Sequence, residues 1–179
     1  MPYVIVDDDV IYQPYSMERL LSGHLKHPKA IIGNRCHMMT VDATGTIGPY
    51  SQWAREARSP SPSFKLMPTG AGGVLYPPGF FADDAVTNTD QILRYAPYAD
   101  DIWLKFNALA RGLPTFATEL SSGSEWYHRY TPTMREGTLM AENVELGLND
   151  IQIERCSEWL SGVKPDWRAL LQSPELERV

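Results

Sequence analysis

Three consecutive aspartates near the start of the chain, Asp7, Asp8 and Asp9, are the first candidates for chemistry. They follow an apolar run over 4–6 whose β-branched residues predict a strand. Adjacent carboxylates repel one another, and a hard divalent cation bound through oxygen relieves that repulsion. Because side chains alternate along a strand, we expect Asp7 and Asp9 on one side and Asp8 on the other. Aspartates that cap turns or face water are the alternative interpretation.

A second acidic pair, Asp100 and Asp101, opens a helix predicted over 102–111. The apolar residues of that segment recur at helical spacing, and Gly112 ends it. Aspartate is a favoured N-cap, and an anion in the first turn is stabilised by the helix dipole. A purely structural role is therefore open for the pair, and we expect Asp100 to be the cap.

Between the two acidic groups, the segment 68–78 carries Gly70, Gly72 and Gly73. Glycine allows positive φ and lets a ligand approach the backbone closely, as a loop beside a diphosphate or an acceptor requires. The spacing is not G-x-G-x-x-G and no P-loop lysine follows, so neither a dinucleotide fold nor a nucleotide triphosphatase is indicated. A tight turn without a chemical role is the alternative.

Taken in order, three segments resemble GT-A glycosyltransferases of a family-2-like bacterial type. The segment 4–14 is similar to the D-x-D strand of that family, and 99–104 is similar to the acidic motif that supplies its catalytic base. The segment 68–78 resembles the glycine-rich stretch between the two motifs in some bacterial members. The resemblance implies an α/β fold with a mixed sheet and flanking helices, a partial GT-A (nucleotide-diphospho-sugar transferase) fold. It also implies that the strand predicted over 30–41 runs beside the D-x-D strand.

The same resemblance implies metal-dependent transfer of a sugar from a nucleotide-diphosphate donor to a carbohydrate or other hydroxyl acceptor, with inversion. Asp9, with Asp7, would hold Mn²⁺ or Mg²⁺, which stabilises charge on the departing phosphates. Asp101 would accept the proton of the attacking hydroxyl as general base. His128 is a further candidate for contact with the metal.

Donor contacts are expected from a wider set of residues around these acids. They are Asp7, Asp8, Gly70, Gly72, Gly73, Asp100 and Trp53. Trp53 lies with Tyr50 in a long loop predicted over 42–63, where an aromatic face would suit the apolar face of a pyranose. Rings that pin this loop to the core are the alternative.

The rest of the chain predicts alternating strands and helices in one domain over 1–163. Strands are predicted over 30–41, 64–67, 74–76 and 113–117, and helices over 15–26, 89–96, 102–111 and 149–160. The last helix is expected to start at a capping box over 149–152. The segment 164–179 is predicted to be a charged tail that frays.

Composition limits the partners of this 179-residue chain. A net charge of −6 without a cluster of Lys and Arg argues against a nucleic-acid partner. Every apolar run is shorter than the roughly 18 residues of a membrane-spanning helix. No secretion signal opens the chain, and Cys36 and Cys156 show no paired spacing. We expect a cytoplasmic protein, or one peripheral at the inner face of the membrane.

Six residues precede Asp7, whereas GT-A enzymes place nucleotide-binding βαβ units before the D-x-D strand. The resemblance thus implies a fold that lacks its N-terminal nucleotide-binding half, with the first strand as an exposed edge. We expect such a chain to form a homo-oligomer or to need a partner chain, and to have weak transferase activity, or none, alone.

Two other classes of function stay open. A hydrolase that uses a metal and paired carboxylates would need the same acids. A non-catalytic carbohydrate- or partner-binding remnant of a glycosyltransferase would keep the fold without the reaction. Binding of a sugar nucleotide would favour the transferase over both.

Overall fold

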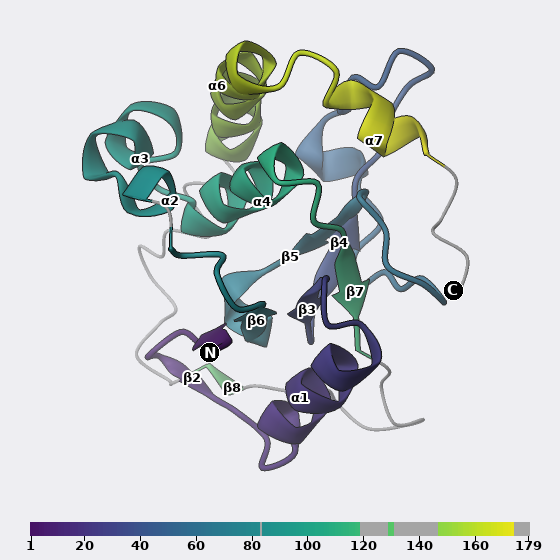
Figure 1. Cartoon of the computed structure of the whole chain (residues 1–179), viewed down its shortest axis with the longest axis vertical. Helices are drawn as coiled ribbons and strands as arrows, with labels where there is room; N and C mark the ends of the chain where they lie inside the picture. Colours follow the sequence, from purple (N-terminus) through teal and green to yellow (C-terminus); the bar gives the residue numbers. More distant parts are fainter. Residues whose placement is uncertain (83, 119–128, 131–146, 174–179) are drawn as a thin grey trace.

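The computed structural model describes residues 1–82, 84–118, 129–130 and 147–173. Helix α1 (Ser16–Lys26) lies on one face of the central sheet, and helices α4 (Asp100–Ala110) and α6 (Leu148–Val163) lie on the other side (Figure 1). The predicted α/β class, with a mixed sheet and flanking helices, is therefore confirmed.

Four short strands make the central sheet. β1 (Tyr3–Ile5) lies at one edge and pairs antiparallel with β6 (Val74–Tyr76), which pairs antiparallel with β3 (Ile31–Gly33). β3 pairs in parallel with β7 (Thr115–Ala117). The neighbour of β1 is thus β6, which corrects the expectation that the strand predicted over 30–41 would lie beside it. All three residues of β6 are buried, as suits a central strand covered on both faces.

The strand predicted over 30–41 is broken into two that belong to different sheets. After β3, the chain leaves the central sheet at Asn34, and β4 (Cys36–Met38) pairs antiparallel with β5 (Leu66–Pro68). The Asn34 side chain donates to the carbonyl of Ser16, so it bonds outside the strand ladder.

The remaining elements are short. They are β2 (Val10–Ile11), which pairs with β8 (Arg129–Tyr130), the 3-10 turns η1 (Tyr50–Gln52) and η2 (Gly70–Gly72), and the helices α2 (Asp84–Thr87), α3 (Thr89–Tyr95) and α7 (Arg168–Gln172). No helix in the described part of the chain is long and apolar enough to cross a membrane.

Alternate residues of the sheet face the two helical layers. Ile31 and Tyr76 pack in the main core with α4 and α6, whereas Ile32 and Leu75 pack with Leu20 of α1. Fully burying one such side chain is worth about 1.5–3 kcal/mol. The two apolar layers therefore fix the strand ends from which the candidate site projects.

Helix α4 is covered on all sides, since every residue from Ile102 to Leu109 is buried. Its buried polar groups find partners: the Trp103 indole N–H donates to the Val86 carbonyl at 2.7 Å, and the Lys105 ammonium donates to the Thr115 hydroxyl at 3.2 Å. A helix packed this closely holds the aspartates of its first turn in place.

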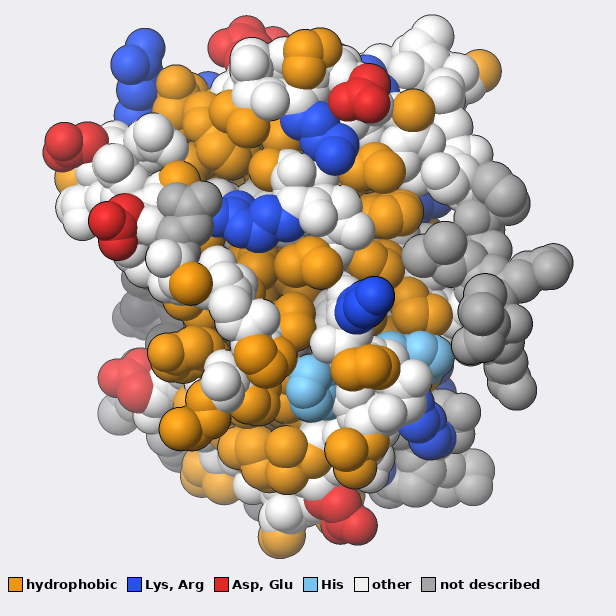
Figure 2. Space-filling model, viewed as in Figure 1, with side chains coloured by type: hydrophobic (Ala, Val, Ile, Leu, Met, Phe, Trp, Pro, Cys, Tyr) orange, Lys and Arg blue, Asp and Glu red, His pale blue; other side chains and the backbone are white. Residues whose placement is uncertain are grey.

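Helix α1 turns a small face to the sheet. Leu20 is buried, and a Cβ on Gly23 would lie 2.6 Å from a side-chain carbon of β3, so only glycine allows this approach. Met17, Leu21 and Leu25 are exposed. Figure 2 shows hydrophobic side chains gathered on this part of the surface.

The chain beyond 163 is packed as far as 173, which corrects the prediction of a frayed tail over 164–179. Trp167 and Leu171 are completely buried, and the Trp167 ring lies 5.8 Å from the Phe106 ring of α4. Their spacing of four puts both on one face of the α7 turn, and their burial outweighs the charged residues around them. Residues 174–179 lie outside the described part.

Two predicted helix starts have different outcomes. The helix predicted over 89–96 starts at the expected place: Asn88 caps α3, and its side chain accepts from the Gln91 N–H at 3.0 Å. Helix α6 instead begins after Gly147, whose φ is 66°, and shows no side-chain cap. Asn149 is buried inside the first turn, so the predicted capping box over 149–152 is wrong.

Replacing Trp167 with Ala should lower the free energy of unfolding by about 3–5 kcal/mol, because it empties a fully buried site against α4. Urea denaturation of the full chain measures this loss. The exposed Leu93→Ala serves as control and should cost less than about 0.5 kcal/mol. A small effect of Trp167→Ala would mean that the 164–173 segment does not hold the core together.

Candidate functional site

The three N-terminal aspartates lie in a turn between β1 and β2, not on the strand itself. Their exposure still alternates: Asp7 and Asp9 are partly buried and Asp8 is exposed. The backbone N–H of Asp7 donates to the Tyr12 hydroxyl at 2.8 Å, which ties the turn to the chain that follows it. The expected difference between Asp8 and its neighbours is therefore present, although a turn and not a strand produces it.

Gly70 is the point where the three predicted motifs meet. A Cβ at this position would lie 3.0 Å from Oδ1 of Asp7, so the carboxylate occupies the space beside the glycine. The Gly70 N–H lies close enough to the Asp101 carboxylate to lower its pKa against the effect of burial. Residues far apart in the sequence thus come together at one backbone unit.

The other two glycines serve the packing of this loop. A Cβ on Gly72 would lie 2.8 Å from the backbone nitrogen of Arg35, and Gly73 has a φ of 81°, which favours glycine. Gly72 and Gly73 are both buried. The tight-turn interpretation therefore accounts for these two residues, and ligand approach is left to Gly70.

Asp101 sits at the start of α4, and a backbone N–H holds its carboxylate. Its Oδ1 accepts from the Ile102 N–H at 2.8 Å, and the nearby Gly70 N–H also favours its ionised form. Burial, and then the charge of Asp100, raise the pKa of Asp101 to about 7. A carboxyl group with a pKa near neutrality can accept and release a proton under ordinary conditions.

Asp100 does not cap α4, which corrects the expected division of roles. The N-cap residue is Ala99, and it makes no side-chain cap bond. The exposed Asp100 side chain accepts from the adjacent Asp101 N–H, at 2.9 Å. Both aspartates therefore belong to the first turn, where the helix dipole favours their charge.

The site concentrates negative charge. Partial burial raises the pKa of Asp7, and the charges of Asp100, Asp9 and Asp8 raise it further. Asp100 and Asp7 also raise the pKa of Asp101, so five carboxylates act on one another in this site. A bound cation would reverse this repulsion and favour the ionised form of each group.

Trp53 is not available for stacking on a ligand. Its side chain is 4% exposed, and its indole N–H donates to the Gly48 carbonyl at 2.9 Å. The alternative interpretation, in which the ring pins the loop to the core, is the correct one for Trp53. Tyr50, whose ring centroid lies 4.8 Å from that of Trp53, is closer to the acids, because the charge of Asp101 contributes to raising its pKa after burial.

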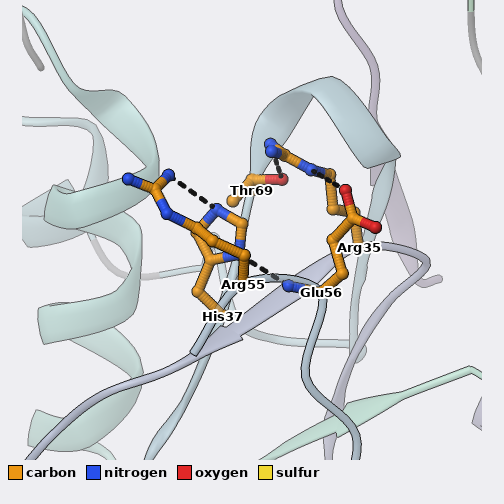
Figure 3. Close-up of polar contacts among 5 residues, drawn as sticks. All are labelled: Arg35, His37, Arg55, Glu56 and Thr69. Carbon is orange, nitrogen blue, oxygen red and sulfur yellow. Dashed lines mark hydrogen bonds and ion pairs between the residues drawn. The ribbon is translucent and has the colours of Figure 1, made fainter. Parts of the chain in front are cut away.

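The sequence did not reveal a group of polar residues beside the loop that carries Tyr50 and Trp53. Figure 3 shows Arg35, His37, Arg55, Glu56 and Thr69 joined by one chain of contacts. The two-residue spacing of Arg35 and His37 was the only signal for the group in the sequence. Arg55 lies in an irregular loop, where no periodic pattern marks it.

The predicted metal ligands are only partly described. Asp7 and Asp9 lie in the same turn, and His128 lies outside the described residues. Among the residues that are described, no three His, Cys, Asp or Glu side chains form a group that could hold a metal ion. Mg²⁺ is commonly held by one or two carboxylates together with substrate phosphates and water, and two carboxylates are what this turn offers. A metal at Asp7 and Asp9 remains a prediction.

Comparisons with models of protein families, with curated proteins and with solved structures gave no match.

The pKa of Asp101 predicts a pH-dependent stability. A carboxyl group with a pKa of about 7 in the folded chain and an ordinary value when unfolded opposes folding while it is ionised. That penalty is complete above pH 7 and fades as the pH falls toward 4. Asp101→Asn should therefore raise the free energy of unfolding at pH 8 by on the order of 1–2 kcal/mol. The gain should shrink toward zero near pH 4.

Urea denaturation at both pH values measures the difference. The matched control is Asp90→Asn, at an exposed position in the first turn of α3. A gain from Asp101→Asn that is equal at pH 8 and pH 4 would contradict the raised pKa.

Proposed function

We propose that this chain is a glycosyltransferase domain of GT-A type that transfers a sugar from a nucleotide-diphosphate donor to an acceptor hydroxyl. The observation that carries the proposal is the meeting of Asp7, Gly70 and Asp101, one residue from each segment that resembles the family. If the three segments resembled such enzymes only in composition, we would not expect them to lie together around one backbone unit.

Asp101 is the proposed general base. In the transfer step, an acceptor hydroxyl oxygen attacks the anomeric carbon of the donor sugar and gives its proton to the Asp101 carboxylate. The bond between that carbon and the diphosphate oxygen breaks, and the nucleotide diphosphate leaves with the electron pair. A single displacement of this kind inverts the configuration. The pKa of about 7 suits the role, because the group can accept a proton and return it to solvent.

Asp7 and Asp9 are the residues that would hold Mn²⁺ or Mg²⁺ with the donor phosphates. A bound divalent cation would stabilise the charge that develops on the departing diphosphate. The carboxylates fit this purpose because they already repel one another around Gly70 and lack a cationic partner among the charges that set the Asp7 pKa. Asp101 is near this space, because the charge of Asp7 contributes to raising its pKa.

The roles of the aspartates can be separated by measuring binding and turnover on the same proteins. Calorimetric titration with a panel of UDP-, GDP- and dTDP-sugars should show donor binding that requires Mn²⁺ and that Asp9→Ala abolishes. Asp101→Asn should keep donor binding but lower turnover at least about 100-fold, as expected for loss of a general base. Asp90→Asn, an exposed aspartate of α3, should behave as the unchanged chain.

Several outcomes would count against these assignments. Metal-dependent binding that survives Asp9→Ala would remove Asp9 from the metal site. Turnover that survives Asp101→Asn would remove Asp101 as base. No binding of any sugar nucleotide to the folded chain would overturn the proposed function as a whole.

A further inference from the structure

Arg55 carries a positive charge that its described neighbours do not balance. Its guanidinium lies 4.7 Å from the centre of the Tyr50 ring, and its charge acts on the Tyr50 hydroxyl by lowering the pKa of that group against the effect of burial. Its Nη1 lies 3.5 Å from Nε2 of His37 (Figure 3). Within the described residues, no carboxylate comes within 4.0 Å of it, since the one ion pair there joins Arg35 to Glu56. The partners of Arg55 are thus all neutral groups at neutral pH.

His37 does not change this balance. The ring is completely buried, and burial followed by the charges of Arg35 and Arg55 lowers its pKa to about 4. Its Nδ1 lies 3.2 Å from the Glu56 backbone nitrogen and its Nε2 lies 3.5 Å from Nη1 of Arg55. A neutral imidazole brings no charge to this contact, so His37 does not balance the guanidinium. An anionic oxygen is the group that would balance it.

The backbone around this contact is held in an unusual conformation. Glu56 has a φ of 53°, in the left-handed region that residues other than glycine rarely adopt. Its carboxylate lies 3.9 Å from Nε of Arg35, and its N–H is fixed on His37. The loop therefore presents Arg55 outward in a defined position, at some cost in backbone strain.

The arginines are linked to the proposed base through Thr69 and Tyr50. Arg35 donates to the Thr69 hydroxyl at 3.2 Å, and Thr69 directly precedes Gly70, whose N–H acts on the Asp101 carboxylate. Asp101, Arg55 and Arg35 all act on the Tyr50 hydroxyl, so Tyr50 lies between the proposed base and the basic group. The charges that raise the pKa of Asp7 are instead those of Asp100, Asp9 and Asp8.

We propose that Arg55, assisted by Arg35 and Tyr50, binds an anionic group of the acceptor and so places the acceptor hydroxyl at Asp101. The acceptor is then an acidic saccharide or phosphate ester, bearing a carboxylate or phosphate that a guanidinium can bind through two hydrogen bonds. This inference rests on the proposed glycosyltransferase function, of which it names the acceptor class.

Direct binding tests the inference independently of turnover. The full chain is titrated with methyl glucuronide, glucose 6-phosphate and neutral methyl glucoside, and binding is followed by NMR. At least one anionic probe should bind about tenfold or more tightly than the glucoside. The anionic probe that binds more tightly then shows whether the acceptor's anionic group is a carboxylate or a phosphate. Arg55→Gln should reduce that binding to the level of the glucoside. Arg58→Gln, a nearby exposed arginine outside the group, should leave it unchanged.

Donor binding by the same variants separates the two proposals. Arg55→Gln should bind sugar nucleotide with Mn²⁺ as the unchanged chain does. Equal binding of all three probes, or no loss in Arg55→Gln, would overturn the acceptor site. A loss of sugar-nucleotide binding in Arg55→Gln equal to the loss of anion binding would assign Arg55 to the donor and would overturn it too. Anion binding through Arg55 without any sugar-nucleotide binding would instead refute the glycosyltransferase proposal.

Discussion

The candidate site depends on the close approach of two acidic segments to Gly70. A Cβ at this position would lie 3.0 Å from Oδ1 of Asp7, and the Gly70 N–H acts on the Asp101 carboxylate. One peptide unit therefore lies beside both acidic segments. A larger residue would displace the Asp7 carboxylate and so change its position relative to Asp101.

Around this point the charges are divided into two groups. The aspartates act on one another on one side, and Arg35 and Arg55 lie with Tyr50 on the other. The aspartates have no cation among the charges that set the pKa of Asp7, and of the two arginines only Arg35 is paired with a described carboxylate, that of Glu56. Lys105 does not balance these charges, because it is a buried residue of α4 whose ammonium donates to the neutral Thr115 hydroxyl. Charges that are left unbalanced near one another are typical of sites that bind charged ligands.

Local signals predicted the elements that local forces determine. The strand over 74–76, the cap of α3 at Asn88 and the helix that carries Asp101 follow from apolar runs and capping residues. The order of the sheet could not be predicted in this way, because the pairing of β1 with β6 depends on contacts between distant segments. Burial of Trp167 was missed because the signal consists of only two apolar positions, Trp167 and Leu171, among proline and charged residues. Arg55 was missed because its environment exists only once its loop lies against His37 and Tyr50.

The position of β1 also affects how the site is assembled. Its described partner in the sheet is β6, with Tyr3 opposite Tyr76, so β1 is synthesised long before the strand that holds it. On the ribosome the acidic turn after β1 must remain without its final contacts until the segment with Gly70 and β6 has emerged. Asp101 belongs to a helix that can begin to form from neighbouring residues, whereas Asp7 depends on a contact of high sequence separation, which is slower to close. The two acids of the site are therefore acquired at different stages of folding, and the edge strand is the part whose late docking completes it.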